Sequence, residues 1–270
     1  MTHRRDETTD AGRQPPRFIT ALAGDDETVL AAQRLRYRVF NAGSSESASS
    51  LATSDRIDRD AFDSHCEHLV VRDTATGDVV GTYRILTAEG ARAAGSFYSE
   101  TEFDLTRLRG LNARLVEVGR ACVDPAYRGG GVITRLLTGL TRYVVANRYD
   151  YVMGCASVDV TSGRAEAASL CRRLLAEHLA PDKWRVAPLA PFWLGNVPAC
   201  EAEMPPLIKA YLRFGATVCG APAWDEAFQT ADLLMLLPMA TMDARFRARL
   251  LRDDPGTEPG RRRRGSRWAA

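Results

Sequence analysis

Residues 115–137, LVEVGRACVDPAYRGGGVITRLL, constrain what this chain can fold into more than any other segment. A run typical of a β-strand leads through a turn and three successive glycines into a helical pattern that starts near Val132. Glycine N–H groups can approach an anion closely, and the first turn of a helix adds unpaired N–H groups and a positive dipole end. Arg128, just before the glycines, can bind phosphate oxygens. The segment predicts a phosphate-binding loop; the alternative is a plain turn in which the glycines only permit the bend.

The periodicity of apolar residues predicts the other elements. Runs at 68–73 and 79–86 flank a turn that ends in glycine, which indicates a β-hairpin. Beyond this hairpin we expect a helix at 25–40, short helix and loop at 87–112, a strand at 115–123, a helix at 132–148, a strand at 151–158, helices at 164–179 and 205–214, a strand at 232–237 and a last helix near 241–252. This succession predicts an α/β fold, in which a mixed sheet carries helices on both faces.

Composition and charge bound the organisation of the chain. With 270 residues, of which 45% are apolar and 26% charged, it can bury the core of a soluble domain. We expect a disordered arm at 1–17, a domain at 18–252 and a disordered basic tail at 253–270. The six cysteines lack C-x-x-C spacing, and there is neither a long apolar run nor a signal-like N-terminus, so reduced thiols and a cytoplasmic location are expected.

The basic tail, RRRRGSRW, has more than one interpretation. Its five arginines exceed the net charge of +2, so the rest of the chain is mildly acidic. Such a tail is most often a solvated end, but it can also attract an anionic membrane surface or an acidic carrier protein. Nucleic-acid binding is not expected, because the arginines lack the aromatic residues on which bases stack.

Several motifs occur in an order that resembles a known family. They are Arg36-Tyr-Arg-Val-Phe40, Asp60-Ala-Phe-Asp63, Gly81-Thr-Tyr-Arg84, Phe97-Tyr-Ser-Glu-Thr-Glu-Phe-Asp104, Glu117-Val-Gly-Arg120, Arg128-Gly-Gly-Gly131 and Gly154-Cys-Ala-Ser157. Together they resemble the GCN5-related N-acyltransferases, in the branch that makes ornithine lipids and is related to the acyl-homoserine-lactone synthases. The resemblance covers about residues 30 to 240, and one departure is Ile133, where the family's loop has Gly or Ala.

The resemblance implies a fold and a reaction. In that fold two neighbouring strands, here 115–123 and 151–158, separate at their C-terminal ends, and the pantetheine arm of the donor lies between them. The implied reaction transfers a 3-hydroxyacyl group from acyl carrier protein to the α-amine of ornithine, the first step of ornithine lipid biosynthesis, without a cofactor. The alternatives are an acyl-CoA-dependent acetyltransferase, an acyl-homoserine-lactone synthase-like enzyme, and a non-catalytic protein that binds acyl thioesters or a membrane.

The chemistry of acyl transfer suggests catalytic residues. The attacking amine must lose a proton, which a nearby carboxylate can accept. Glu117 is the first candidate, because it is a carboxylate among apolar residues of the strand beside the expected gap. The alternative is that Glu117 only lies on a solvated face or forms an ion pair with Arg120. The predicted catalytic set is Glu117 and Arg120. Backbone N–H groups near 121–123 are expected to stabilise the oxyanion.

An amino acid with a second amine needs binding groups of both charges. We expect Asp60 and Asp63 to hold the cationic end, and Arg36, Arg84 or Arg120 to bind the carboxylate. The predicted acceptor-binding set is Arg36, Phe40, Asp60, Asp63 and Arg84, and the predicted donor-binding set is Cys122, Val123, Arg128, Gly129, Gly130, Gly131, Val132 and Ser157. Individual members have simpler interpretations, such as a solvated arginine, a turn aspartate, a buried thiol or a serine that caps a turn.

A metal site is not predicted. His65 and His68, with Cys66 and Glu67 between them, lead directly into a strand and lack further ligands, so a structural role is favoured.

Overall fold

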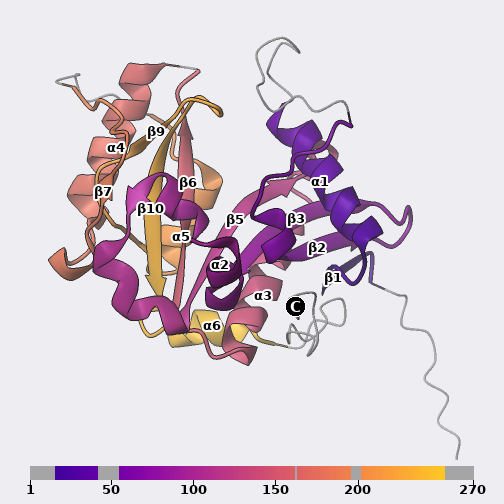
Figure 1. The fold of residues 1–270 in the computed structure, drawn as a ribbon. Helices are drawn as coiled ribbons and strands as arrows, with labels where there is room; N and C mark the ends of the chain where they lie inside the picture. Colours follow the sequence, from indigo (N-terminus) through magenta and orange to yellow (C-terminus); the bar gives the residue numbers. More distant parts are fainter. Residues whose placement is uncertain (1–15, 42–54, 162, 196–201, 253–270) are drawn as a thin grey trace, which may run out of the picture.

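An eight-stranded mixed sheet forms the centre of the computed structural model, which describes residues 16–41, 55–161, 163–195 and 202–252. Its strands follow the order β1, β2, β3, β5, β6, β10 and β8, and β9 also pairs with β10 (Figure 1). They are β1 (Phe18–Leu22), β2 (Glu67–Asp73), β3 (Val79–Thr87), β5 (Leu115–Val123), β6 (Tyr151–Asp159), β8 (Thr217–Val218), β9 (Ala223–Asp225) and β10 (Thr230–Pro238). Within this described sheet β5 and β6 are the parallel pair, and the other neighbours are antiparallel.

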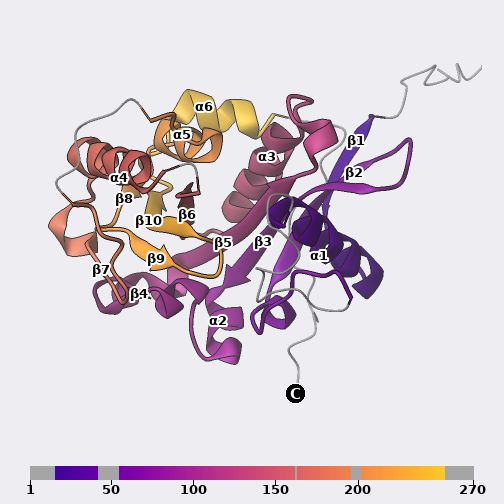
Figure 2. The ribbon, with the colours of Figure 1, turned by 90° about the horizontal axis from the view of Figure 1, so that it is seen from above.

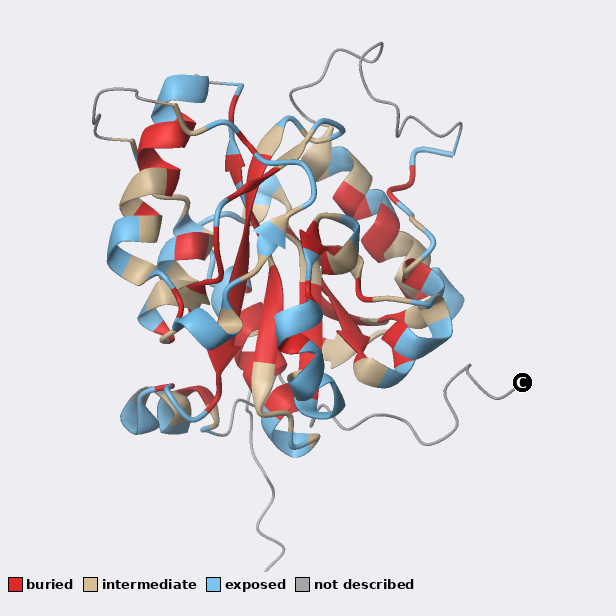
Figure 3. Ribbon diagram, turned by 60° about the vertical axis from the view of Figure 1, so that its left-hand side comes forward, coloured by how far each residue is buried: buried red, intermediate tan, exposed pale blue. Residues whose placement is uncertain are grey.

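Helices cover both faces of the sheet. One face carries α1 (Asp26–Phe40) and α2 (Ala88–Ala94), and the other carries α3 (Val132–Ala146), α4 (Arg164–His178), α5 (Pro206–Arg213) and α6 (Ala244–Leu250) (Figure 2). The strands are largely buried, whereas the outer sides of the helices are exposed (Figure 3). None of the helices in the described ranges is long and apolar enough to cross a membrane.

Local sequence signals explain where α1 and α3 begin. Asp25 caps α1, because its carboxylate accepts a 2.7 Å hydrogen bond from the Thr28 N–H. The helix α3 follows Gly131, whose φ of +83° suits a residue without Cβ. Close packing of α3 on the sheet depends on Gly81, because a Cβ there would lie 2.6 Å from Val132.

A bulge in β5 changes the course of this strand beside β3. Thr82 pairs with Cys122 and Arg84 with Gly119, so that two residues of β5, Arg120 and Ala121, lie opposite one residue of β3. Arg120 adopts a φ of +51°, in the left-handed region that non-glycine residues rarely occupy. The bulge therefore turns the backbone at this point without a glycine.

The parallel strands β5 and β6 pair only over their first residues. The register runs from Leu115 opposite Tyr151 to Glu117 opposite Met153 and then stops, although each strand has nine residues. On its other side β6 pairs with β10 along its whole length. The two strands therefore diverge toward their C-terminal ends, as the family resemblance implied.

The fold class and the main elements agree with the sequence prediction. The hairpin, the strands β5, β6 and β10 and the helices α1, α3, α4 and α5 lie where they were expected, within a few residues. Sequence analysis missed β1, β8, β9 and a two-stranded sheet made of β4 (Phe103–Asp104) and β7 (Ala187–Pro188). The domain boundaries stay a prediction, since the basic tail and nearly all of the predicted arm lie outside the described residues.

Candidate active site

A cavity of about 560 Å³ opens where β5 and β6 diverge. Its walls come from β3, β5, β6 and β10 and from α3 and α5, together with the 3₁₀ turn Tyr98–Thr101. Most of its lining is apolar. A cavity with an apolar body and a few polar groups is the usual form of a binding site for a small molecule or an acyl chain.

The lining changes character along β6 and β10. Ser157 lies opposite Asp232 in the register, and both line the cavity near the C-terminal end of β6. Toward the other end Val152 lies opposite Leu237. The apolar part is lined by Leu137, Leu140, Val144, Val152, Ile208, Phe214, Met235, Leu237, Met239 and Met242. The cavity thus joins a polar region to a deep apolar region.

Asp63 is the centre of a buried ionic network. Its two oxygens accept hydrogen bonds from Arg36 Nη2 at 2.7 Å and Arg84 Nη1 at 2.8 Å. Burial alone would raise the pKa of the Asp63 carboxyl, but the Arg36 and Arg84 guanidiniums outweigh it and hold this pKa well below its usual range. Arg84 also donates to Asp60 at 2.7 Å. Both carboxylates predicted to hold a cation are therefore already paired with arginines.

The predicted acceptor-binding residues divide into two groups. Arg84 and Phe40 line the cavity. Arg36 does not, because its side chain is 0% exposed and its Nε lies 2.7 Å from Asp58. In the described structure Arg36 therefore acts on the cavity as a positioning residue, through Asp63 and through Asp58, which lies 3.5 Å from Arg120. Asp60 and Asp63 act through the arginines.

Arg120 brings a positive charge to the polar part of the cavity. Its guanidinium lies 3.2 Å from Asp60 and stacks over the rings of Tyr98 and Phe228, with 5.1 and 4.9 Å between centroid and guanidinium carbon. Its side chain is 14% exposed, so it remains accessible to a ligand. The two rings were missed by sequence analysis, although Tyr98 belongs to one of the quoted motifs.

Glu117 is buried at the point where β5 and β6 separate. Its Oε2 accepts a 2.7 Å hydrogen bond from the Tyr98 N–H, and its Oε1 accepts one of 2.8 Å from the Ser99 N–H and another from the Ser99 hydroxyl. Burial raises the pKa of the Glu117 carboxyl, although these hydrogen bonds offset part of the effect. The structure thus excludes the simple alternative of a solvated carboxylate, and it places Glu117 on the cavity wall.

The residues predicted for the acyl donor occupy different surroundings. Ser157 lines the cavity, whereas Cys122 packs against α1, where burial raises the pKa of its thiol to about 12. Cys122 therefore belongs to the core and does not line the cavity. Val123 packs against the main apolar core, and Val132 is buried under the loop.

The glycine loop lies at the exposed N-terminal end of α3. Arg128 and the three glycines are exposed, and Gly129, like Gly131, has positive φ. A Cβ at Gly129 or Gly131 would meet no atom within 4 Å, so space remains above this backbone. Such a loop is suited to bind a phosphate group, as the sequence predicts.

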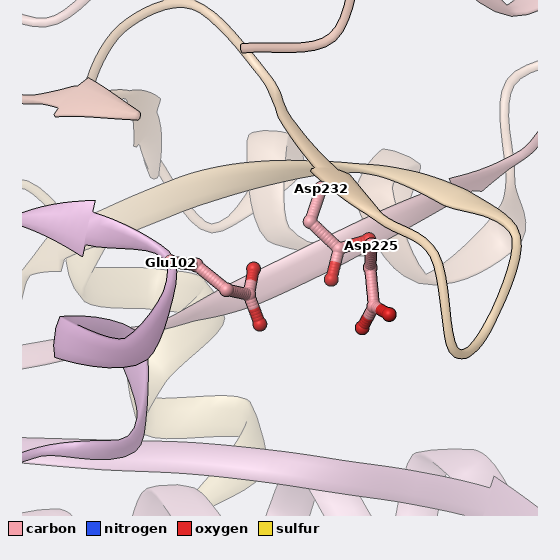
Figure 4. Close-up of side chains that lie close together, drawn as sticks. All are labelled: Glu102, Asp225 and Asp232. Carbon is pink, nitrogen blue, oxygen red and sulfur yellow. The ribbon is translucent and has the colours of Figure 1, made fainter. Parts of the chain in front are cut away.

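Two acidic residues that line the polar part of the cavity, Asp225 and Asp232, and the neighbouring Glu102 were not predicted. Glu102, Asp225 and Asp232 lie close together, with one carboxylate oxygen of each within 4.8 Å of the others (Figure 4). The available signal was Asp232, a charged residue inside the apolar strand TADLLMLLP. His65 and His68, for which the sequence favoured a structural role, belong to no such cluster in the described residues, and His68 Nε2 lies 3.3 Å from the Asp63 carbonyl oxygen.

Comparison with known proteins agrees with this architecture. The family model for the acetyltransferase (GNAT) domain matches residues 35–138. The L-ornithine N(alpha)-acyltransferase of Agrobacterium fabrum is 37% identical over 242 residues, which are 84% of this chain and 83% of that protein. The chain belongs to the L-ornithine N(alpha)-acyltransferase family.

Another member and a solved structure support this membership and the fold. The L-ornithine N(alpha)-acyltransferase of Brucella abortus is 35% identical over 240 residues, 83% of this chain and 85% of that protein. Among solved structures, the CoA-dependent acyl-homoserine lactone synthase BjaI superimposes with a TM-score of 0.52, 14% identity and coverage of 86% of this chain and 87% of that one. At this identity the likeness shows that the acyltransferase fold is shared.

Proposed function

We propose that this protein transfers an acyl group from a phosphopantetheine thioester, carried by acyl carrier protein, to the α-amine of L-ornithine. The observation that carries the proposal is the cavity at the divergence of β5 and β6, which joins charged groups to an apolar chamber. Membership in the L-ornithine N(alpha)-acyltransferase family supports the acceptor. The product would be the N-acylated amino acid from which an ornithine lipid is built.

The apolar part of the cavity suits the acyl chain. Its walls include Met235, Met239 and Met242, whose flexible side chains adapt to irregular shapes. Burying methylene groups there is favourable by about 0.8 kcal/mol for each CH₂. A long acyl chain would therefore contribute more to donor binding than an acetyl group, which favours a fatty-acyl donor.

The phosphopantetheine would enter between β5 and β6. Its single phosphate would lie on the loop from Arg128 to Gly131, where exposed glycine backbone and the start of α3 support an anion. The Ser157 hydroxyl, at the polar mouth of the cavity, would contact the pantetheine arm. Nothing in this chemistry calls for a cofactor.

Glu117 and Arg120 would serve the reacting groups. Free α-amines have a pKa of about 8. Because the pKa of the Glu117 carboxyl is raised, it lies closer to the pKa of the amine, which helps the carboxylate to take the proton directly or through water. Arg120 would bind the acceptor carboxylate. The backbone at Ala121, which lies in the bulge and lines the cavity, would stabilise the oxyanion.

Product analysis tests the proposed function. Purified protein is incubated with L-ornithine and with either a 3-hydroxyacyl carrier protein or the matching acyl-CoA, and N-acylornithine is measured by mass spectrometry together with the released thiol. We expect transfer from the carrier protein with a higher kcat/KM than from CoA. Transfer to no amino acid from either donor would contradict the function, whereas a preference for CoA would contradict only the carrier.

A further inference from the structure

Two tyrosine hydroxyls meet in the apolar part of the cavity. Tyr83 lies in β3 and is 1% exposed, and Tyr211 lies in α5. Both residues line the cavity, and their hydroxyl oxygens form a hydrogen bond with each other. Tyr83 belongs to the same core cluster as Leu137 and Leu140 of α3, which also line the cavity. The pair therefore places two polar groups among walls that are largely apolar.

The tyrosine pair has more hydrogen-bond donors than it can use by itself. Each phenol hydroxyl carries one O–H donor and accepts up to two hydrogen bonds, so the mutual bond uses only one of the two donors. Neither hydroxyl has another hydrogen-bond partner among the described residues. By contrast, the Thr141 hydroxyl, which also lines the cavity, donates to the Leu137 carbonyl oxygen at 2.8 Å. Because a buried donor without an acceptor costs free energy, the remaining O–H of the pair calls for a ligand.

The cavity connects this pair with the proposed reacting groups on the other face of the sheet. Successive residues of a strand point to opposite faces. Glu117 accepts hydrogen bonds from the turn Tyr98–Thr101, whereas Val118 and Tyr83 belong to the core cluster under α3. All three residues line the cavity, which therefore continues from one face to the other where β5 and β6 diverge. An acyl chain held at the polar face would reach the tyrosine pair through this gap.

Tyr83 also lies beside the place proposed for the thioester carbonyl. It is the residue of β3 that lies opposite the bulge formed by Arg120 and Ala121. The Ala121 backbone is the proposed oxyanion donor, and neighbouring strands lie only about 4.8 Å apart. A chain that turns from this backbone into the apolar part of the cavity would pass the Tyr83 ring within its first few carbons. The hydroxyl pair is therefore suited to contact a group close to the thioester.

We propose that the hydroxyl pair of Tyr83 and Tyr211 forms hydrogen bonds with a hydroxyl on carbon 3 of the donor's acyl chain and so selects hydroxylated chains over plain ones. The inference rests on the proposed function and adds the residues that determine which acyl group is transferred. A chain hydroxyl accepts the O–H that the pair leaves over and donates its own proton to a tyrosine oxygen. A plain chain leaves that O–H unpaired in an apolar site, and for this reason a site built around a hydroxyl rejects the analogue that lacks it.

Two donors of equal chain length test the proposal. The protein is assayed with L-ornithine and either 3-hydroxytetradecanoyl or tetradecanoyl carrier protein, and the ratio of the two kcat/KM values measures recognition of the hydroxyl alone. We expect a preference of about 10-fold or more for the hydroxylated chain. The double variant Tyr83→Phe, Tyr211→Phe should lose this preference through a lower kcat/KM for the hydroxylated donor, with an equal or higher value for the plain donor. Tyr143→Phe, at a buried tyrosine of the same core cluster that does not line the cavity, is the matched control and should leave the ratio unchanged.

Binding without turnover separates the inference from the proposed function. The Tm is measured with 3-hydroxytetradecanoic acid and with tetradecanoic acid, and the hydroxylated acid should raise it more in the original protein and in Tyr143→Phe, but not in the double variant. A protein that acylates no amine yet shows this difference would contradict the proposed function and support the inference.

Two results would overturn the inference. One is an equal kcat/KM for the two donors in the original protein. The other is an equal loss for both donors in the double variant. Together with a lowered Tm, that loss would mean that the pair only holds α5 against β3, and with an unchanged Tm it would assign the hydroxyls to a step that all donors share.

Discussion

Arg36 donates a 2.7 Å hydrogen bond from Nη2 to Oδ1 of Asp63, and both side chains are buried, with exposed fractions of 0% and 2%. Asp63 in turn holds Arg84, which lines the cavity. A residue on α1 thus fixes the position of a charged group in the candidate active site through one carboxylate. Because removal of one partner leaves a buried charge without balance, this pair makes the polar wall of the cavity sensitive to substitution.

Two arginines of α1 provide a matched test of this network. Arg36→Gln should lower the free energy of unfolding by about 3–5 kcal/mol, because it leaves Asp63 partly unpaired in the interior. Arg38→Gln, on the same helix, removes a 3.4 Å contact with Asp124 at a side chain that is 57% exposed, and it should cost about 1 kcal/mol or less. Urea denaturation measures both values. Equal losses would show that the buried pair has no special role.

Substitution of Glu117 tests the proposed base. Glu117→Gln should lower kcat by about 10²–10⁴ while donor binding persists. The acidic limb of the pH–rate profile should disappear, because the variant has no carboxyl to titrate. Since Gln offers only one acceptor oxygen to the Tyr98 and Ser99 donors, Tm must be measured alongside. A full rate at every pH would exclude Glu117 as the base, and a large fall in Tm with an unchanged pH profile would assign it to the support of the turn Tyr98–Thr101.

The glycine loop can be tested apart from its backbone strain. Gly131→Ala and Gly77→Ala both place a Cβ at positive φ with no atom within 4 Å, so both should lower stability by a similar amount. Only Gly131→Ala should also weaken donor binding, because Gly77 lies in the hairpin turn between β2 and β3. Arg128→Ala should weaken donor binding by about 1.5–3 kcal/mol without changing Tm. Calorimetry measures the affinity of each variant for a phosphopantetheine thioester. If Gly131→Ala and Arg128→Ala both bind it as tightly as the original protein does, the loop assignment is wrong.

Buried His68 predicts a loss of stability in acid. Burial lowers the pKa of His68 to about 4, although the Asp63 carboxylate offsets part of the effect. In the unfolded chain a histidine has a pKa of about 6.5. The unfolded state therefore binds the proton first, so this contribution to stability is present above pH of about 6.5 and is lost as pH falls toward about 4. His68→Gln should show a shallower decline in this window, and His178→Gln, with a side chain that is 34% exposed, should not. Identical slopes for His68→Gln and the original protein in urea titrations would contradict this assignment.

Much of the fold could be predicted because its signals are local. The hairpin and the segment from β5 through the glycine loop into α3 each carry their periodicity and turn residues within a short stretch. The strands β1, β8 and β9 could not be found in this way, since they have only two to five residues and depend on a partner strand. The quoted motifs also located Arg84, Glu117 and Arg120, which the structure brings to one cavity.

The sequence by itself determined the elements, the glycine loop and the residue types available for acyl transfer. Only the tertiary structure decided which charges cancel. It buried Arg36 against Asp63, 27 residues further along the chain, and it brought Glu102, Asp225 and Asp232 close together. Periodicity and capping act over a few residues, whereas the balance of a buried charge depends on every group that folding brings within several ångströms. For this reason the carboxylates that sequence assigned to the substrate cation proved to be paired with arginines, and a second acidic cluster came from three separate parts of the chain.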